Sequence, residues 1–363
     1  MTIHRTATFL LLACALALAL PAGAGETPAE PLPVHVGGRA IVETDGSLSF
    51  GWPGVYFESR FRGPGVRIRL DAPAEHMRLL IDGEERLLFR EAGLVDVTLQ
   101  ALPDADHVIR LEKLTESQTG GGRFIGFFPS TGSTPLPPPV RSRQIEFIGD
   151  SHSVGYGVAS ADRSCTADQV HDLTDTQQAF GPRLARRLDA DYRVNAYSGF
   201  GVVRNYDGTS AGLSLPLIYD RLKPDSPDPI ETTASGWRPA IIVINLGTND
   251  FSTPLKAGEP WRDAAALRSA WRGAYVAFIG RLMRNNPDAR FILMGSDAFV
   301  GEAERVAAAV NAGAPGRVTT LRFDGLDLGG CDWHPSAADQ ERLADLLEAV
   351  LRGMDDPWRE AAR

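Results

Sequence analysis

Alternation of apolar and polar residues marks the first third of the chain. Val66, Ile68 and Leu70 alternate with charged residues, and Asp82-Gly83 separates two apolar runs further on. A period of two places one set of side chains on one face of a strand, so this pattern predicts strands with one buried face. An Asp-Gly pair between such runs favours a hairpin turn. We therefore predict a small β-sandwich, or jelly roll, over residues 34–130.

The pattern changes after a proline-rich segment, residues 131–142, which we interpret as a stiff linker. From residue 143 to 354 short apolar runs alternate with helical stretches, which predicts a mostly parallel sheet covered by helices on both faces, an α/β/α domain. The predicted strands cover residues 145–148, 192–196, 241–245, 291–294 and 318–323. The predicted helices cover residues 177–188, 261–283, 302–311 and 336–351.

One connection in the second domain is unusually long. Residues 202–239 are rich in Gly, Pro and Asp and show no clear periodicity. Long connections without regular structure in compact domains are usually functional or disordered. We expect this one to face the substrate.

The N-terminus has the pattern of a targeting segment. An apolar run from Phe9 to Leu20 follows Arg5 and precedes the small residues Ala22-Gly23-Ala24. The run is shorter than the roughly 20 residues that span a bilayer, so it favours a cleaved secretory signal over an anchor. We expect residues 1–24 to be removed and the protein to be secreted or periplasmic.

Composition and charge narrow the class of partner. A hydrophobic content of 43% and a charged content of 23% are those of an ordinary globular protein. The formal net charge of -9 opposes binding to nucleic acid or to an anionic membrane surface, so we expect neither as a partner. The sequence has no Cys/His cluster with metal-ligand spacing, and we predict no metal, no cofactor and a monomer.

Two cysteines remain once the predicted signal is removed, Cys165 and Cys331. An even pair in an exported protein suggests one disulfide. Two buried free thiols are the alternative that these residues alone leave open.

Polar residues follow the predicted parallel strands in succession. Ser151 follows the first strand, Gly199 the second and Asn249 the third, while His334 comes after the last strand and a loop. The ligand site of such a sheet lies beyond the carboxyl ends of its strands, so we expect these residues to converge there. Each block also has a plain structural explanation as a turn or a helix cap. Their common place at one edge favours a catalytic site.

The chemistry of these residue types assigns their roles. The Ser151 hydroxyl needs a base to become a nucleophile, and His334 is the candidate base. An imidazole needs a partner on its other nitrogen, and Asp332 is the nearest carboxylate. The backbone N–H groups of Ser151 and Gly199 and the Asn249 amide are candidate donors to an oxyanion. We therefore predict a serine esterase.

These blocks resemble those of the SGNH (GDSL-like) hydrolase superfamily and, within it, carbohydrate esterase family 2. The resemblance covers nearly the whole chain after residue 24. It implies an N-terminal jelly-roll domain, an SGNH-type hydrolase domain and the removal of O-acetyl groups from plant polysaccharides such as xylan and glucomannan. The matching segments are Phe147-Ile148-Gly149-Asp150-Ser151, Gly155-Tyr156-Gly157, Ser198-Gly199-Phe200-Gly201, Gly247-Thr248-Asn249-Asp250 and Asp332-Trp333-His334-Pro335.

One departure from the broader superfamily concerns the partner of His334. There the supporting Asp usually lies three residues before the His, a position that Cys331 occupies here, and Asp332 lies two before. The family 2 enzymes share this spacing, and some are thought to use a Ser–His dyad with a backbone carbonyl behind the His. The resemblance thus leaves Asp332 or a carbonyl as the partner. It also favours a Cys165–Cys331 disulfide that holds His334 in register.

Acetylated polysaccharide or oligosaccharide is the expected partner, and an exposed aromatic ring is expected to stack on a sugar. Core packing is the alternative for each candidate. A lipase or thioesterase of the same chemistry is an alternative function, and so is a carbohydrate-binding protein without turnover, although intact Ser151 and His334 oppose the latter. The candidate aromatic residues are Trp333, Trp261, Tyr206 and Trp237.

Overall fold

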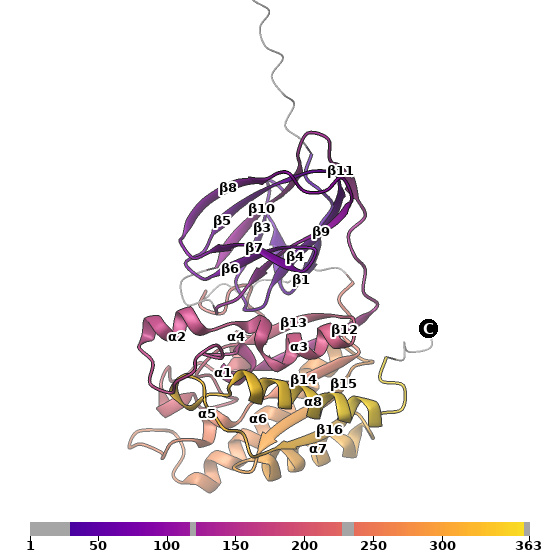
Figure 1. Ribbon diagram of the computed structural model, residues 1–363. Coiled ribbons are helices and arrows are strands. Elements are labelled where there is room, and N and C mark those ends of the chain that lie inside the picture. The colour runs from indigo at the N-terminus through magenta and orange to yellow at the C-terminus, as the bar shows by residue number, and fades with distance from the viewer. Residues whose placement is uncertain (1–29, 117–120, 227–235, 359–363) are drawn as a thin grey trace, which may run out of the picture.

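The computed structural model describes residues 30–116, 121–226 and 236–358 (Figure 1). The predicted signal peptide, residues 1–24, lies outside them. A β domain is stacked on an α/β domain, with strand β12 entering the second domain beside β13 (Figure 1).

The N-terminal domain is a sandwich of two antiparallel sheets, which confirms the predicted β-sandwich. One sheet has the order β1-β4-β9-β6-β7 with β11 paired to β4, and the other has the order β2-β3-β10-β5-β8. In β5 the buried residues are Val66, Ile68 and Leu70, the apolar set of the alternating pattern. The strands are β1 (His35–Gly37), β2 (Ala40–Val42), β3 (Leu48–Phe50), β4 (Tyr56–Arg62), β5 (Val66–Ala72), β6 (Met77–Ile81), β7 (Glu84–Phe89), β8 (Gly93–Leu99), β9 (Asp106–Lys113), β10 (Gly122–Pro129) and β11 (Thr134–Leu136).

Part of the predicted linker, residues 131–142, belongs to this sandwich. The strand β11 pairs antiparallel with β4, although Pro135 lies at its centre. A proline lacks the N–H that a second neighbour would need, and β11 is at the edge of its sheet, so the missing donor costs little there. The extended connection is therefore shorter than the sequence suggests.

The second domain has a five-stranded parallel sheet in the order β13-β12-β14-β15-β16, as the predicted α/β/α fold requires. Its strands are β12 (Arg143–Gly149), β13 (Ala190–Ala196), β14 (Ile241–Asn245), β15 (Arg290–Ser296) and β16 (Val318–Phe323). The α-helices are α1 (Ser151–Val154), α2 (Ala167–Leu173), α3 (Phe180–Arg187), α4 (Leu215–Ile218), α5 (Thr248–Phe251), α6 (Ala264–Asn285), α7 (Val300–Gly313) and α8 (Ala337–Gly353). Short 3₁₀ turns cover η1 (Thr176–Gln178), η2 (Tyr206–Gly208) and η3 (Cys331–Trp333).

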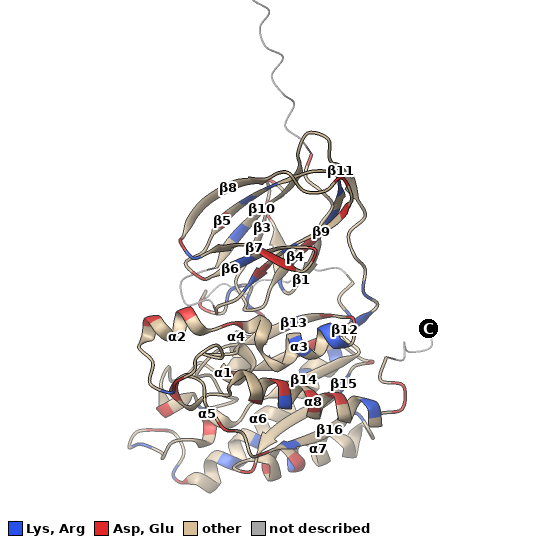
Figure 2. Cartoon of the chain, viewed as in Figure 1, with Lys and Arg blue, Asp and Glu red and all other residues tan. Residues whose placement is uncertain are grey.

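Helices cover both faces of this sheet. In β14, Ile242 and Ile244 pack into the core on the side of α6 and α7, while Ile241 and Val243 pack on the side of α3 and α8. Strands buried on both faces explain the continuous apolar runs of the sequence. Basic residues lie on α3 and both acidic and basic residues lie on α8 (Figure 2), and Arg187 of α3 bonds to Asp345 of α8 at 2.7 Å.

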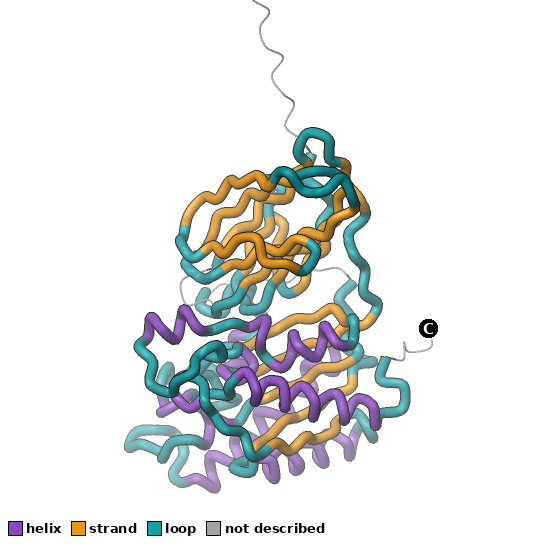
Figure 3. The backbone as a smooth tube through the Cα atoms, viewed as in Figure 1, coloured by secondary structure: helices purple, strands orange, loops and turns teal. Residues whose placement is uncertain are grey.

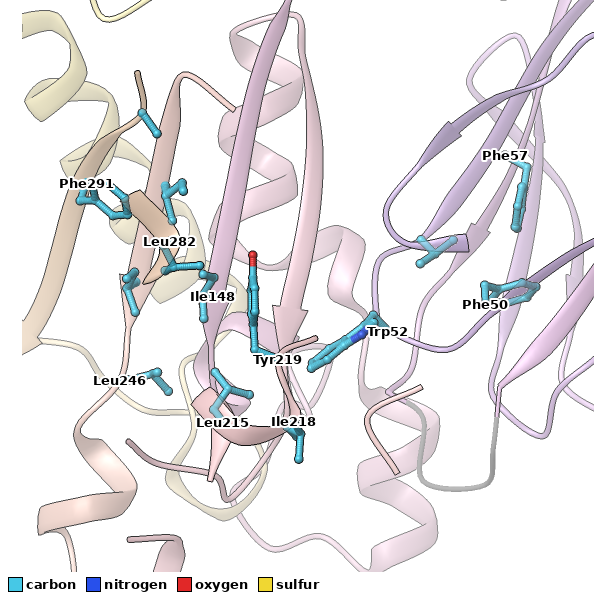
Figure 4. Packing of buried hydrophobic residues seen from close by; sticks show 14 of the residues in the cluster. Phe50, Trp52, Phe57, Ile148, Leu215, Ile218, Tyr219, Leu246, Leu282 and Phe291 are labelled. Atoms are coloured by element: carbon cyan, nitrogen blue, oxygen red, sulfur yellow. The ribbon is translucent and has the colours of Figure 1, made fainter. Parts of the chain in front are cut away.

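The long connection of residues 202–239 supports the β domain over part of its length, rather than facing only the substrate as predicted. Leu215 and Ile218 are buried because the short apolar helix α4 packs into the core. Tyr219 lies beside Trp52 of the β domain in Figure 4. The indole N–H of Trp52 donates to the Arg221 carbonyl at 2.8 Å. The two domains therefore share one apolar core.

Loops collect at one end of the second domain, where the parallel strands terminate (Figure 3). Because β12 lies between β13 and β14, the chain leaves it at the point where the strand order reverses. That point is where ligands bind in open parallel sheets. No helix within residues 30–116, 121–226 and 236–358 is long and apolar enough to cross a bilayer.

Candidate active site

Ser151 is the first residue of α1, directly after β12. The carboxylate of Asp150 caps this helical turn by accepting the His152 backbone N–H at 3.1 Å. The cap fixes a sharp strand-to-helix turn and leaves the serine at the carboxyl end of the sheet.

The imidazole of His334 lies between Ser151 and a backbone carbonyl. Its Nε2 is 2.9 Å from Ser151 Oγ, and its Nδ1 is 2.9 Å from the carbonyl oxygen of Cys331. A carbonyl can only accept, so Nδ1 carries the proton and Nε2 of the neutral ring is free to accept from the serine hydroxyl. This tautomer is the one that a general base requires.

The Asp332 carboxylate makes a different contact from the one predicted for a triad. It accepts the Tyr156 hydroxyl at 3.0 Å, and Nδ1 of His334 contacts the Cys331 carbonyl instead. The backbone explains the difference, since Asp332 and Trp333 both adopt left-handed conformations, with φ of 51° and 61°. The Tyr156 ring lies over the His334 ring, with centroids 4.1 Å apart.

Burial sets the protonation of both histidines near Ser151. Burial lowers the pKa of His334 below its ordinary value, while the Cys331 carbonyl and the charge of Asp332 act in the opposite direction. For His152 burial, with His334 nearby, lowers the pKa to about 3. Both rings are therefore neutral at neutral pH. Among the described residues, only His334 forms a hydrogen bond with the Ser151 hydroxyl.

A disulfide holds the turn that carries His334. Cys165 and Cys331 are bonded, with Cα atoms 5.4 Å apart and a sequence separation of 166. The chain passes close by at Gly157, where φ is 55° and an added Cβ would lie 2.4 Å from the Cys331 Cβ. The turn closes on itself, because the Gly330 N–H donates to the His334 carbonyl at 3.0 Å.

The loop of residues 198–204 follows β13 and is bridged to the nucleophile turn by Asn249, and it has one open backbone donor. Along this loop only the N–H of Gly199 donates to no group in the part of the chain that the structure describes. The other N–H groups donate as follows: Ser198 to Glu116 at 2.9 Å, Phe200 to the Tyr197 carbonyl at 3.2 Å, Gly201 to Asn205 at 3.1 Å, and Val202, Val203 and Arg204 to Asp250 at 3.0, 2.9 and 2.9 Å.

Backbone conformation, not space, requires glycine at position 199. Its φ is +81°, and an added Cβ would have no atom within 4 Å. The left-handed region is accessible to glycine without strain. The Gly199 carbonyl accepts the Tyr206 N–H at 2.8 Å, which ties the loop to the segment that follows it.

The side-chain amide of Asn249 lies between the nucleophile turn and this loop. Its Nδ2 is 2.9 Å from the Phe200 carbonyl and 3.2 Å from the Asp150 carboxyl group. Burial raises the pKa of Asp150 to about 7, against the stabilising N–H of His152. Both amide hydrogens thus have acceptors, which orient the group.

The predicted aromatic residues occupy different places. Trp333 is 65% exposed and Tyr206 is 53% exposed, and they extend from the His334 turn and from the segment tied to Gly199. The Arg163 guanidinium carbon lies 4.2 Å from the Trp333 ring centroid. Trp261 is half-buried before α6. Trp237 precedes β14, at the amino end of the sheet, so it does not belong with Ser151.

Sequence reasoning did not assign roles to three residues around the site. Asp250 accepts the loop N–H groups, Tyr156 covers His334, and Glu116 reaches Ser198 from the β domain. The first two lie inside the Gly-Thr-Asn-Asp and Gly-Tyr-Gly blocks, which gave a usable signal. Glu116 lies in no motif. Within the described ranges no group of three or more His, Cys, Asp or Glu side chains is arranged to hold a metal ion.

Comparison with known proteins identifies both domains. Residues 36–139 match the Carbohydrate esterase 2 N-terminal family, and residues 147–357 match the GDSL-like Lipase/Acylhydrolase family. An acetylxylan esterase / glucomannan deacetylase of Cellvibrio japonicus is 44% identical over 337 residues, which cover 91% of this chain and 93% of that protein.

Solved structures of similar proteins support the same family assignment. A carbohydrate esterase whose active site has divergent catalytic and non-catalytic binding functions is 41% identical and superposes with a TM-score of 0.85 over 91% of this chain and 100% of that chain. A family two carbohydrate esterase from Clostridium thermocellum in complex with cellohexaose is 27% identical, with a TM-score of 0.76 over 88% and 98%. The chain therefore belongs to the GDSL-like hydrolases and, within them, to carbohydrate esterase family 2.

Proposed function

We propose that this esterase is exported through its N-terminal signal, residues 1–24, and removes O-acetyl groups from plant polysaccharides of the xylan and glucomannan type. The relative from Cellvibrio japonicus acts on these substrates by its name. The observation that carries the chemistry is the 2.9 Å contact of His334 Nε2 with Ser151 Oγ, and the open N–H of Gly199 supports it.

In the first step Ser151 Oγ attacks the acetyl carbonyl carbon while His334 Nε2 takes the hydroxyl proton. The imidazolium that forms keeps its Nδ1–H on the Cys331 carbonyl. We propose that Asp332 stabilises this cation through its charge, without a direct hydrogen bond, because its carboxylate is bound to Tyr156. The catalytic pair is then a Ser–His dyad with a carbonyl behind the base.

The oxyanion of the tetrahedral intermediate would be bound by the N–H groups of Ser151 and Gly199 and by the Asn249 amide. The two backbone donors have no other acceptor among the described residues. Asn249 must release or share one of its acceptors, and the longer contact, 3.2 Å to Asp150, is the one it gives up more easily. Each such donor typically contributes roughly 10²–10³ in rate.

Collapse of this intermediate breaks the bond between the acetyl carbon and the sugar oxygen, and His334 returns its proton to that oxygen. Water then attacks the acetyl-Ser151 ester with His334 again acting as base, and acetate leaves while the serine hydroxyl is restored. Both half-reactions use the same donors, so no further group is needed.

We propose that Trp333 stacks on a sugar ring next to the acetylated position. Two consecutive left-handed residues cost of order 1–3 kcal/mol each, and such strain collects at functional sites. Here it places an indole in solvent beside His334. Tyr206, exposed on the other side of Gly199, is a second candidate, and half-buried Trp261 a weaker third.

Acetate release from acetylated xylan, acetylated glucomannan and 4-nitrophenyl acetate tests the proposal. Ser151→Ala should abolish release from all three, and long-chain 4-nitrophenyl esters should be poor substrates of the wild type. Ser153→Ala is the matched control, because Ser153 lies in the same turn and its buried hydroxyl has no hydrogen-bond partner among the described residues. Full activity in Ser151→Ala would overturn the mechanism, and a preference for long acyl chains would overturn the substrate class.

A further inference from the structure

The N-terminal domain reaches the 198–204 loop through the side chain of Glu116. Its Oε2 accepts the backbone N–H of Ser198 at 2.9 Å, from 82 positions away in sequence. Glu116 is 7% exposed and follows β9, which lies between β4 and β6 inside its sheet. Glu116 lies three residues beyond the end of β9, in a segment that the Leu114 N–H joins to the His76 carbonyl at 2.9 Å, so this contact couples the loop to an anchored part of the other domain.

The contact lies next to the open donor. Peptide groups are planar, so only φ and ψ of Ser198 separate the direction of its own N–H from that of the Gly199 N–H. On the far side the Gly199 carbonyl is held by the Tyr206 N–H at 2.8 Å. The loop is thus fixed immediately before and immediately after the open Gly199 amide.

The surroundings of Glu116 join the two halves of the site. A cavity of about 150 Å³ is lined by Glu116 and Thr115 from the β domain and by Tyr156, which covers His334, from the other. Lys113, fully buried, lies within electrostatic reach of Glu116 and donates to the Thr115 carbonyl. A nearby buried cation favours the ionised carboxylate, which is the stronger acceptor for Ser198.

We propose that Glu116 is a positioning residue for the reaction, which fixes the direction of the Gly199 N–H toward the oxyanion. The β domain then contributes to transition-state stabilisation in the hydrolase domain, in addition to its structural role. This inference rests on the proposed function, in which the Gly199 amide is an oxyanion donor.

The test measures kcat, KM and Tm for 4-nitrophenyl acetate hydrolysis by the full chain. Glu116→Ala should lower kcat about 10- to 100-fold and leave KM within about threefold, because a misdirected oxyanion donor affects the transition state more than the bound ester. Glu116→Gln keeps an oxygen that can accept the Ser198 N–H and should recover most of kcat. It also keeps the proposal testable if the alanine variant does not fold.

Glu112→Ala is the matched control. Glu112 is a buried carboxylate on β9 that also faces the domain contact, where it bonds to Arg110 at 2.6 Å. Its loss should lower Tm without lowering kcat. A folded Glu116→Ala with unchanged kcat, a Glu116→Gln as slow as the alanine variant, or an equal loss of kcat in Glu112→Ala would overturn the proposal. Failure of the proposed function would show separately, as an inactive wild type or an active Ser151→Ala.

Discussion

Two loops face Ser151, and they are held by different kinds of interaction. The turn of residues 330–334 is fixed by the Cys165–Cys331 disulfide and by backbone hydrogen bonds within the turn. The loop of residues 198–204 is fixed by buried carboxylates, Asp250 from its own domain and Glu116 from the β domain. The first presents the proposed base, His334, and the second presents the proposed oxyanion donor, the Gly199 N–H.

The difference follows from what each loop has to do. A base must change its protonation state during turnover, so a neutral carbonyl and a covalent link support His334 without a fixed charge on Nδ1. A donor for an oxyanion has to keep a fixed direction, and hydrogen bonds from the neighbouring backbone N–H groups hold the loop around it. A carboxylate suits this purpose because it accepts several N–H groups at once. Asp250 accepts three of them, which leaves that of Gly199 open.

The largest effect should come from removing the side chain that the turn presents. His334→Ala should lower kcat by on the order of 10⁴–10⁶, because Ser151 then has no base and the remaining rate comes from binding and the oxyanion donors. Steady-state hydrolysis of 4-nitrophenyl acetate measures it. His171→Ala, a half-buried histidine on α2, is the control and should retain wild-type kcat. A His334→Ala enzyme within tenfold of wild type would show that another group activates Ser151.

The amide that bridges the 198–204 loop to the nucleophile turn should give the next effect. Asn249→Ala should lower kcat by roughly 10²–10³ with little change in KM, since one of the proposed oxyanion donors is lost. The backbone N–H groups of Gly199 and Ser151, which this substitution leaves in place, would account for the activity that remains. Progress curves for acetylated xylan and for the aryl acetate should show the same loss. A change confined to KM would mean that Asn249 binds the sugar instead.

The sequence predicted some features of this site and not others. The strands β14 and β16 have the predicted bounds, and the rule that ligands bind at carboxyl ends brought Ser151, Gly199 and His334 to one edge. The direction of the Asp332 carboxylate could not be predicted, because it depends on a left-handed φ of 51°, and an aspartate in the sequence does not indicate that conformation. Helix α2 was missed although Thr166 and Gln169 form a capping box at its start.

The contact of Glu116 could not be predicted from the sequence, for a more general reason. Its bond to Ser198 joins two domains, and its existence depends on how the sandwich is seated on the parallel sheet. Patterns of period two or 3.6 describe elements one at a time, so they contain no information about that placement. Contacts between domains are therefore found from the structure and not from sequence motifs.

Breaking the disulfide should affect the turn and spare the loop. The double variant Cys165→Ala/Cys331→Ala should lower the free energy of unfolding by about 2–5 kcal/mol, since the bond closes a segment of 166 positions. We expect kcat to fall about tenfold through a less ordered His334, because small displacements of a catalytic group are costly. Urea unfolding and kinetics measure the two effects, and treatment of the wild type with dithiothreitol should reproduce both. Unchanged kcat would show that the backbone contacts alone hold the turn.

The smallest effect should come from Asp332→Asn, and it has a defined sign. The Asp332 charge raises the pKa of His334 against the stronger effect of burial. Its removal should lower that pKa, so the acid limb of kcat/KM should move to lower pH while kcat at neutral pH falls less than about tenfold. An aspartate that holds a catalytic histidine directly is worth roughly 10⁴ in kcat, so a loss of that size would restore Asp332 as a triad member. Asp324→Asn, an exposed carboxylate paired with Arg342, controls for the change in net charge and should leave the profile in place.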